Sequence, residues 1–160
     1  MRIENEQQML AIANDYQNYT VEEAAKSINA KLPYTIVDYS FEDKSITYRF
    51  QTEEWMQNPY GSVHGGLIAT MVDLAMGVTT RSLCGNFTPT INLSLSYLNP
   101  VPGKSGLIVK TNATRVGGTF IQITAECYVE GSDKICTTAS AVFYCNKNLT
   151  YRNKQIDEKI

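Results

Sequence analysis

The spacing of apolar residues changes partway along the chain, and the change separates helical segments from strand-forming ones. The run LIATMVDLAMGV directly after Gly66 is apolar on nearly every side of a helix, so we expect one enclosed helix over residues 64–83. Further on, apolar residues fall at every second position and would share one face of a strand: Ile121, Ile123, Ala125, Cys127 and Val129. This alternation predicts a half-buried strand.

Shorter patterns predict the remaining elements. Residues 3–14 and 20–31 have helical spacing, and Thr20-Val-Glu-Glu23 matches a capping box in which Thr20 would begin the second helix. Pro33 would end that helix. Turns are expected at residues 41–44 and 117–118. The other strands are expected at residues 34–39, 45–51, 90–99, 105–115 and 134–145.

The order of these elements predicts an α+β fold. Helices come first, then two strands, one long helix and four strands whose short connections favour antiparallel pairing. Because the long helix is apolar nearly all round, a single sheet could enclose it only by curling around it. We therefore divide the chain into a helical extension at residues 1–33, one domain at residues 34–145 and a polar tail at residues 146–160.

Composition and charge narrow the range of partners. The chain has 160 residues, 43% hydrophobic and 19% charged, which suffices for one globular domain with a full core. The formal net charge is -2 and no basic stripe is present, which argues against a nucleic acid partner. The apolar run is shorter than a bilayer span, and residues 1–10 lack a signal-peptide pattern. We therefore expect no membrane partner and a cytoplasmic location.

The cysteines raise one question about pairing. With His64 as the only histidine and no C-x-x-C motif, a zinc site is not expected. If the turn at residues 130–133 is symmetric, Cys127 and Cys136 would face each other closely enough for a disulfide. Two small buried thiols are the interpretation that a reducing compartment favours.

Asp73 is the first candidate for chemistry, because it is the only charged residue of the apolar run. A carboxylate in such surroundings costs free energy, so either a neighbouring hydroxyl or amide satisfies it or it serves as general base or nucleophile. On a helix it would share a face with small residues only: Gly66, Ala69, Thr70, Gly77 and Thr80. A substrate, a strand or a second subunit could approach that face closely.

The start of the helix is the second candidate. Gly65 and Gly66 follow His64, and their backbone N–H groups would be accessible at a helix N-terminus. Such donors could stabilise an oxyanion, at roughly 3 kcal/mol per donor, although two glycines could also only permit a tight turn. Asp73 lies about half a turn around the helix from His64. One site would therefore need these two residues from different copies of the chain.

Several of these residues together resemble the signature of a known family. Asn58, Gly61, His64-Gly65-Gly66 and Asp73 are similar to the motif of the hot-dog-fold acyl-CoA thioesterases of the phenylacetate-degradation (PaaI) type, within the 4-hydroxybenzoyl-CoA thioesterase superfamily. Later segments resemble the family in the same order: the strand at 90–99 with its proline, Arg115-Val-Gly-Gly-Thr119, and the small-residue strand at 131–143. The resemblance extends over residues 34–145, and its fold is an antiparallel sheet wrapped around a long helix.

The resemblance implies hydrolysis of an acyl-CoA thioester to a free acid and CoA, without a separate cofactor. Asp73 would be nucleophile or general base, and the Gly65 amide would polarise the thioester carbonyl. Three further residues would complete the catalytic site: Asn58, His64 and Thr90. Four would contact the CoA part of the substrate: Gly66, Arg115, Gly117 and Gly118. The family also implies a homodimer or tetramer with active sites at the subunit interface.

Some features leave alternatives open. Asn58 lies in ordinary turn sequence, and Thr90 could simply begin a strand. Many relatives carry a basic residue at or after the glycine turn, where this chain has Thr119, so Arg115 or Lys110 would have to serve the CoA phosphates. A non-catalytic acyl-CoA-binding or sensing module would share the fold. So would an enoyl thioester dehydratase or hydratase, which needs a histidine and an acid acting together. Aromatic and medium-chain acyl groups both fit a pocket lined by aromatic residues and methionine.

Overall fold

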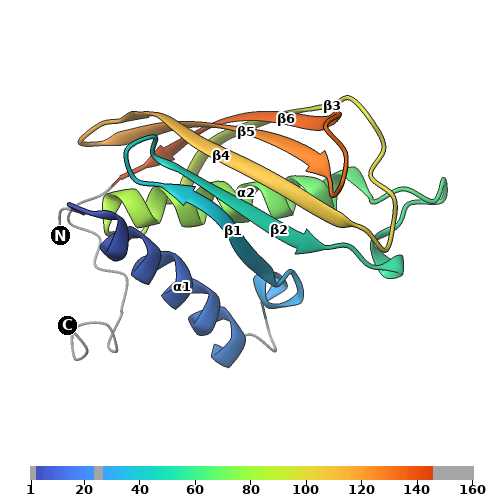
Figure 1. Ribbon diagram of the computed structural model, residues 1–160, viewed down its shortest axis with the longest axis horizontal. Helices are drawn as coiled ribbons and strands as arrows, with labels where there is room; N and C mark the ends of the chain where they lie inside the picture. Colours follow the sequence, from blue (N-terminus) through green and yellow to red (C-terminus); the bar gives the residue numbers. More distant parts are fainter. Residues whose placement is uncertain (1–2, 24–26, 146–160) are drawn as a thin grey trace.

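The core of the molecule is a six-stranded antiparallel sheet curved around one long helix, α2 (Gly65–Cys84), as Figure 1 shows. The computed structural model describes residues 3–23 and 27–145, with side chains for 3–15 and 27–145. The strands lie in the order β1-β2-β4-β5-β6-β3. Their bounds are β1 (Tyr34–Ser40), β2 (Ser45–Gln51), β3 (Thr90–Tyr97), β4 (Gly106–Val116), β5 (Phe120–Val129) and β6 (Ile135–Tyr144). This is the hot-dog fold expected from the sequence.

Helix α2 fills the curve of the sheet. Met71, Val72, Ala75 and Met76 are fully buried, which accounts for a helix that is apolar on most of its surface. Gly85 ends it with a left-handed backbone conformation, φ +73°, that suits glycine best. The helix has the expected length, but the expectation that it is too short to span a bilayer is corrected, because by length and composition alone it could cross a membrane. In the most apolar 18-residue stretch of α2, 61% is buried inside the fold.

The strands confirm the alternation seen in the sequence. Along β5, apolar side chains at odd positions from Ile121 to Cys127 are buried against the helix and polar ones between them are exposed. β1 and β2 pair around the turn at residues 41–44, and β4 and β5 pair around Gly117 and Gly118. The outer face of the sheet is thus polar and its inner face forms the core.

β3 departs from this pattern because it is an edge strand. It pairs with β6 on one side only, and among the described residues its other edge has no partner strand. The sequence predicts a half-buried strand, yet Ile91 is 58% exposed and Tyr97 52% exposed. An unpaired edge with apolar side chains is a surface that another chain can cover.

The N-terminal segment forms one helix instead of the two that the sequence predicts. α1 (Glu6–Glu23) runs through Thr20, so the capping box proposed there is wrong. No glycine or proline interrupts residues 3–32, so nothing in the local sequence ends the first helix before the second begins. The helix start is instead held by Asn5, whose Oδ1 accepts from the Gln8 N–H at 3.0 Å. A short 3-10 helix, η2 (Ile28–Lys31), follows and ends before Pro33.

Helix α1 packs against α2 on the side away from the sheet (Figure 1). Met9 and Ala13 are fully buried in that contact layer. The Tyr34 hydroxyl donates to the Ala13 carbonyl oxygen at 3.1 Å and fixes the helix to the start of β1. The segment therefore adds a third layer to part of the domain. The predicted polar tail at residues 146–160 lies outside the described residues.

The disulfide differs from the Cys127–Cys136 pair that the strand pattern made possible. Cys84, at the end of α2, forms a disulfide with Cys145, just after β6. Cys127 and Cys136 remain free and buried, as the thiol interpretation expected. A bulge in the β5–β6 pairing between Cys127 and Tyr128 shifts the register, so that Thr137, not Cys136, lies opposite Cys127. Burial raises the pKa of both free thiols.

This arrangement predicts a stepwise thiol titration. Treated with a chromogenic aryl disulfide at pH 8, the native protein should show almost no reactive thiol, because burial keeps Cys127 and Cys136 inaccessible and protonated. Denaturant should expose these two thiols, and a protein reduced in denaturant and then freed of reductant should show all four cysteines of the chain. Two rapidly reacting thiols in the native protein would contradict the packing of β5 on β6.

Candidate active site

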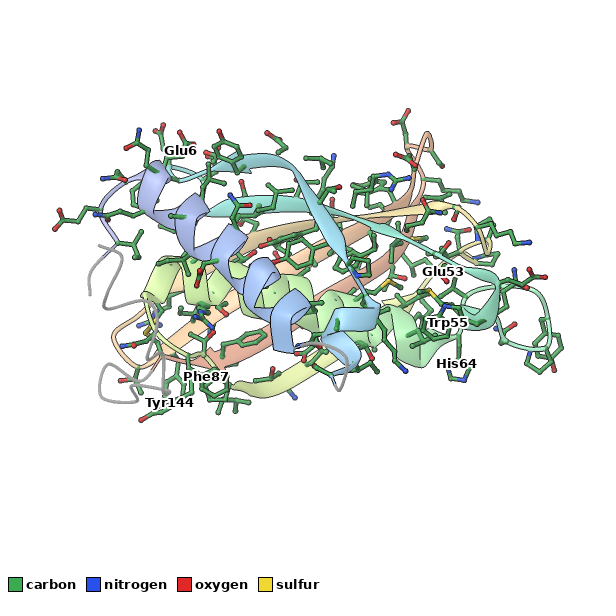
Figure 2. All side chains as sticks on the ribbon, turned by 90° about the horizontal axis from the view of Figure 1, so that it is seen from below. Glu6, Glu53, Trp55, His64, Phe87 and Tyr144 are labelled. Carbon is green, nitrogen blue, oxygen red and sulfur yellow. A yellow bond between two sulfur atoms is a disulfide. The ribbon has the colours of Figure 1, made fainter. Side chains whose placement is uncertain are left out.

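His64 forms the N-terminal cap of α2. Its Nδ1 atom accepts a hydrogen bond from the Gly66 N–H at 3.0 Å, so the neutral ring carries its proton on Nε2. The His64 N–H donates to the Met56 carbonyl at 2.8 Å and anchors the preceding loop. Figure 2 shows His64 projecting at the same end of the molecule as Trp55, with Phe87 and Tyr144 at the opposite end.

Gly65 is the first residue of α2, and its N–H makes no hydrogen bond to another described residue. The positive end of the helix dipole adds to its donor strength. Gly65 lines a cavity of about 360 Å³ together with Asn58, Ile68 and Tyr97. The Gly66 N–H, by contrast, is occupied by His64. The structure therefore offers Gly65, not Gly66, as the donor open to a bound carbonyl.

Asn58 lines the same cavity, but its side chain holds its own loop. Its Oδ1 accepts from the Tyr60 N–H at 2.9 Å, and its Nδ2 donates to the Ser62 hydroxyl at 3.0 Å. These bonds match the turn interpretation of Asn58-Pro-Tyr-Gly61. The second Nδ2 hydrogen leaves one donor for a ligand in the cavity.

Asp73 lies half-buried on the side of α2 that neither the sheet nor α1 covers completely. The small residues predicted to share its face are also incompletely buried: Gly66, Ala69, Thr70 and Gly77. Thr80 is the exception, since it is buried and its hydroxyl bonds the Thr88 hydroxyl at 2.9 Å. The open face therefore ends one turn earlier than the helical pattern predicts.

The Thr90 hydroxyl donates to Asp73 Oδ1 at 2.8 Å. This bond joins α2 to the first residue of β3 and holds one carboxylate oxygen, while leaving Oδ2 available. A neighbouring hydroxyl is what the purely structural interpretation of Asp73 requires. The same bond also orients the carboxylate, as a general base or nucleophile would need. A carboxylate with one oxygen held and one free is a usual form of a positioned base.

Gly65 and Asp73 lie far apart within one chain. Eight residues of an α-helix rise about 12 Å, so the free amide and the carboxylate cannot both contact one thioester. The pair Asp73–Thr90 and the cavity at Gly65 are therefore separate half-sites along α2. Any reaction that needs both must take them from two copies of the chain.

A second cavity of about 360 Å³ lies at the hairpin between β4 and β5. Arg115, Gly117 and Gly118 line it, as the sequence interpretation grouped them, together with Thr119, Phe120 and Gln122. Gly66 is not part of it, because it lies at the start of α2. Lys110 is also elsewhere: its Nζ lies 4.9 Å above the centre of the Tyr128 ring. Arg115 is thus the basic residue of this cavity.

Of the residues that line the cavity at Gly65, sequence reasoning named only Asn58 and Gly65 as site residues, and those it missed include Ile68 and Tyr97. Ile68 follows from the helical periodicity as a core residue, and the cavity uses only its edge. In the sequence, Tyr97 is one of the alternating apolar positions of the strand at 90–99. Its place as the last residue of β3, level with the start of α2, could be found only from the structure.

Comparison with known proteins finds similarity to thioesterases. The family model described as the thioesterase superfamily matches residues 60–136, which include Gly65, Asp73, Thr90 and the β4–β5 hairpin but not Asn58. Among curated relatives, the acyl-coenzyme A thioesterase THEM4 of Xenopus laevis is 29% identical over 105 residues, covering 66% of this chain and 47% of the relative. THEM4 of Rattus norvegicus is 30% identical over 107 residues, with 66% and 45% covered. The chain thus spans somewhat under half the length of these relatives.

Solved structures agree on the fold. A phenylacetic acid degradation-related protein of Ralstonia eutropha JMP134 superposes with a TM-score of 0.68 at 23% identity, covering 81% of this chain and 98% of that one. Thioesterase superfamily member 2 of Mus musculus gives a TM-score of 0.71 at 14% identity, with 89% and 100% covered. A thioesterase-like protein of Streptococcus pneumoniae TIGR4, solved with coenzyme A, gives 0.63 at 22% identity, with 69% and 86% covered.

Proposed function

We propose that this chain, which carries a hot-dog domain of the thioesterase superfamily, hydrolyses the thioester bond of an acyl-CoA. One observation carries the proposal: a free helix N-terminal amide in a cavity and a hydroxyl-bonded carboxylate lie on the same helix, in a chain similar to acyl-CoA thioesterases. The first group suits a carbonyl oxygen and the second suits an attacking group.

In the proposed reaction, the thioester carbonyl oxygen accepts a hydrogen bond from the Gly65 N–H. Asp73 either takes a proton from water, whose oxygen attacks the carbonyl carbon, or attacks directly. Direct attack gives an anhydride that water then opens. In both routes the carbon–sulfur bond breaks, the thiolate of CoA leaves and takes up a proton, and the acyl group departs as a carboxylate. Thr90 holds Asp73 Oδ1, Asn58 lines the Gly65 cavity, and His64 caps the start of α2.

We further propose a homodimer in which each active site combines Gly65 of one copy with Asp73 of the other. The separation of about 12 Å between Gly65 and Asp73 along α2 supports a site built from two copies. The open edge of β3, with Ile91 and Tyr97 exposed, supplies an apolar surface for pairing. The small residues beside Asp73 let a second backbone approach closely. Further pairing of dimers into tetramers is compatible with this arrangement.

The CoA part of the substrate is assigned to the cavity at the β4–β5 hairpin. Arg115 supplies a positive charge for a phosphate, and the Gly118 N–H makes no hydrogen bond to another described residue, whereas the Gly117 N–H donates to the Phe120 carbonyl at 3.0 Å. The streptococcal neighbour was solved with coenzyme A and one from Streptococcus mutans with acetyl CoA, which supports a ligand of this class. No separate cofactor is required, and the expected cytoplasmic location supplies acyl-CoA.

The function is tested with a panel of aryl-CoA and aliphatic acyl-CoA esters of increasing chain length. Release of free CoA thiol is followed in parallel with loss of the conjugated double bond of enoyl-CoA. Thiol release with at least one ester supports the proposal and reports the acyl preference. Enoyl hydration without thiol release would assign the hydratase alternative, and tight binding without either reaction would assign the binding module.

The donor role of Gly65 can be tested by removing its N–H. A Gly65→Pro variant suits the chain path, because proline fits the first helical position and the extended conformation of His64, φ -60° and ψ 132°, fits a residue before proline. Its Cβ would lie 3.3 Å from Tyr97 Cζ, so Gly65→Ala, which adds the same Cβ and keeps the N–H, is the reference for the loss. The proline variant lacks the N–H, so its kcat should fall by about 10²-fold relative to that reference. Circular dichroism should show unchanged helix content. A kcat equal to that of the wild type would exclude this amide as the carbonyl donor.

The same variant tests the shared site. Mixed dimers of Gly65→Pro and Asp73→Asn chains contain one site in which both groups are intact, so random mixing should restore about a quarter of the wild-type activity. Each parent alone should remain nearly inactive. Failure of co-refolded mixtures to gain activity, with mixed dimers demonstrated by mass spectrometry, would refute the two-copy site.

A further inference from the structure

The peptide group between Gly65 and Gly66 is held at both of its polar atoms. Its N–H, on Gly66, donates to His64 Nδ1 at 3.0 Å. Its carbonyl oxygen, on Gly65, accepts from the Tyr97 hydroxyl at 2.8 Å. One partner comes from the loop before α2 and the other from the end of β3. This single peptide is therefore clamped between two side chains from different elements.

The two glycines make room for the clamp. A Cβ atom on Gly65 would lie 3.3 Å from Cζ of Tyr97, and one on Gly66 would lie 3.2 Å from His64 Nδ1. Each glycine thus accommodates one of the two side chains at close range. Two consecutive glycines also leave the backbone with more conformational freedom than any other pair. The two hydrogen bonds restrict that freedom at the start of the helix.

The restriction bears on the reactive donor. The Gly65 N–H has no hydrogen bond to another described residue, and the peptide group that carries it is held only at its other end, where the His64 carbonyl accepts from the Leu67 and Ile68 N–H groups at 2.9 and 3.2 Å. Only the φ and ψ angles of Gly65 separate this N–H from the clamped peptide. From this geometry we propose that Tyr97 is a positioning residue: by holding the Gly65 carbonyl, it aims the Gly65 amide at the thioester oxygen. The inference rests on the proposed function.

A purely structural role for the Tyr97 hydroxyl is poorly supported by its surroundings. The end of β3 is already fixed by backbone bonds, since the Leu98 and Asn99 N–H groups donate to the Cys136 carbonyl at 2.9 and 3.1 Å. Asn99 Nδ2 adds a bond to the Ile135 carbonyl at 2.7 Å. Tyr97 itself is 52% exposed and lines the cavity at Gly65. The Tyr97 hydroxyl therefore contributes more to holding the start of α2 than to holding the end of β3.

The test is the Tyr97→Phe variant, which keeps the ring against Gly65 and removes the hydroxyl. We expect kcat to fall about five- to tenfold with KM nearly unchanged, the effect of one lost hydrogen bond expressed only in the transition state. Tyr128→Phe is the matched control, because it removes a tyrosine hydroxyl that bonds Glu126 on the outer face of the sheet. A Tyr97→Phe enzyme with wild-type kcat would overturn the proposal.

A second measurement does not depend on catalysis. In glycine-labelled protein, ¹H–¹⁵N spectra should show altered Gly65 and Gly66 amide shifts in Tyr97→Phe, with faster hydrogen exchange at Gly66 as the clamp loosens. Tyr128→Phe should leave both signals unchanged. If the wild type releases no CoA from any ester, the proposed function fails, while these spectra still report on the clamp. Unchanged Gly65 and Gly66 signals in Tyr97→Phe would overturn the inference.

Discussion

Replacing Asp73 by asparagine is expected to lower kcat for thioester hydrolysis by about 10²- to 10⁴-fold, the contribution of a positioned general base or nucleophile. Asparagine has the same shape, and its amide oxygen can still accept from the Thr90 hydroxyl, which holds Asp73 Oδ1 at 2.8 Å. It cannot take up a proton or form an anhydride. The loss therefore falls on the chemical step, with KM changed little.

The fold should tolerate this change. Asp73 is half-buried on the open face of α2, away from the residues enclosed by the sheet. Thermal unfolding should therefore occur close to the wild-type temperature, which separates a chemical effect from misfolding. Asp133→Asn, at an exposed position of the β5–β6 turn, removes one carboxylate as a control and should keep full activity. An Asp73→Asn enzyme that hydrolyses a good substrate at the wild-type rate would remove Asp73 from the mechanism.

Removing the disulfide should produce the largest change in stability. The Cys84→Ala/Cys145→Ala double variant should lose about 4 kcal/mol of unfolding free energy, because the cross-link closes a loop with a sequence separation of 61 and restricts the unfolded chain. The double variant is the cleaner choice, since a single substitution would leave an unpaired buried thiol. Urea unfolding followed by circular dichroism gives the difference.

The disulfide also acts locally. The Cys145 N–H donates to the Thr119 carbonyl at 2.7 Å, and the Tyr144 N–H donates to the Pro89 carbonyl at 2.9 Å. The cross-link thus joins α2 to the point where the β4–β5 hairpin and the segment before β3 meet the end of β6. A reductant should destabilise the wild type to the level of the double variant and leave that variant unaffected. A wild type with the same unfolding curve in oxidising and reducing buffer would contradict the cross-link.

The state of this disulfide in the cell bears on location. Disulfides are rare in reducing compartments, so the Cys84–Cys145 bond does not fit the expected cytoplasmic location. Alkylating the thiols at the moment of cell lysis would report whether Cys84 and Cys145 are paired in vivo. Full pairing would favour an oxidising compartment over the cytoplasmic expectation.

Local periodicity predicted the parts of the fold that depend on neighbouring residues. The apolar run around Asp73 predicted α2 and its open face, and the alternation from Ile121 predicted β5. These patterns are decided within a few residues of each position. Two helices were expected at the N-terminus because Thr20 carries a local capping signal. The structure instead has α1 continuing through Thr20.

Contacts between distant segments could not be obtained in this way. The pairing of Cys84 with Cys145 depends on how far α2 extends under β6, and the bulge beside Cys127 depends on strand register. The bond from Tyr97 to Gly65 likewise depends on where β3 ends against α2. Asp73 and Thr90 were grouped by family resemblance, and the hydrogen bond between them adds the geometry.

The position of β3 in the sheet has a consequence for the order of folding. β3 precedes β4, β5 and β6 in the chain, yet its ladder pairs Tyr97 with Thr137 of β6, the last strand to be made. The hairpins β1–β2, β4–β5 and β5–β6 close short loops and can form early, whereas β3 must wait for a partner distant in sequence. Because Thr90 and Tyr97 stand at its two ends, a chain can acquire most of its sheet before either half-site exists.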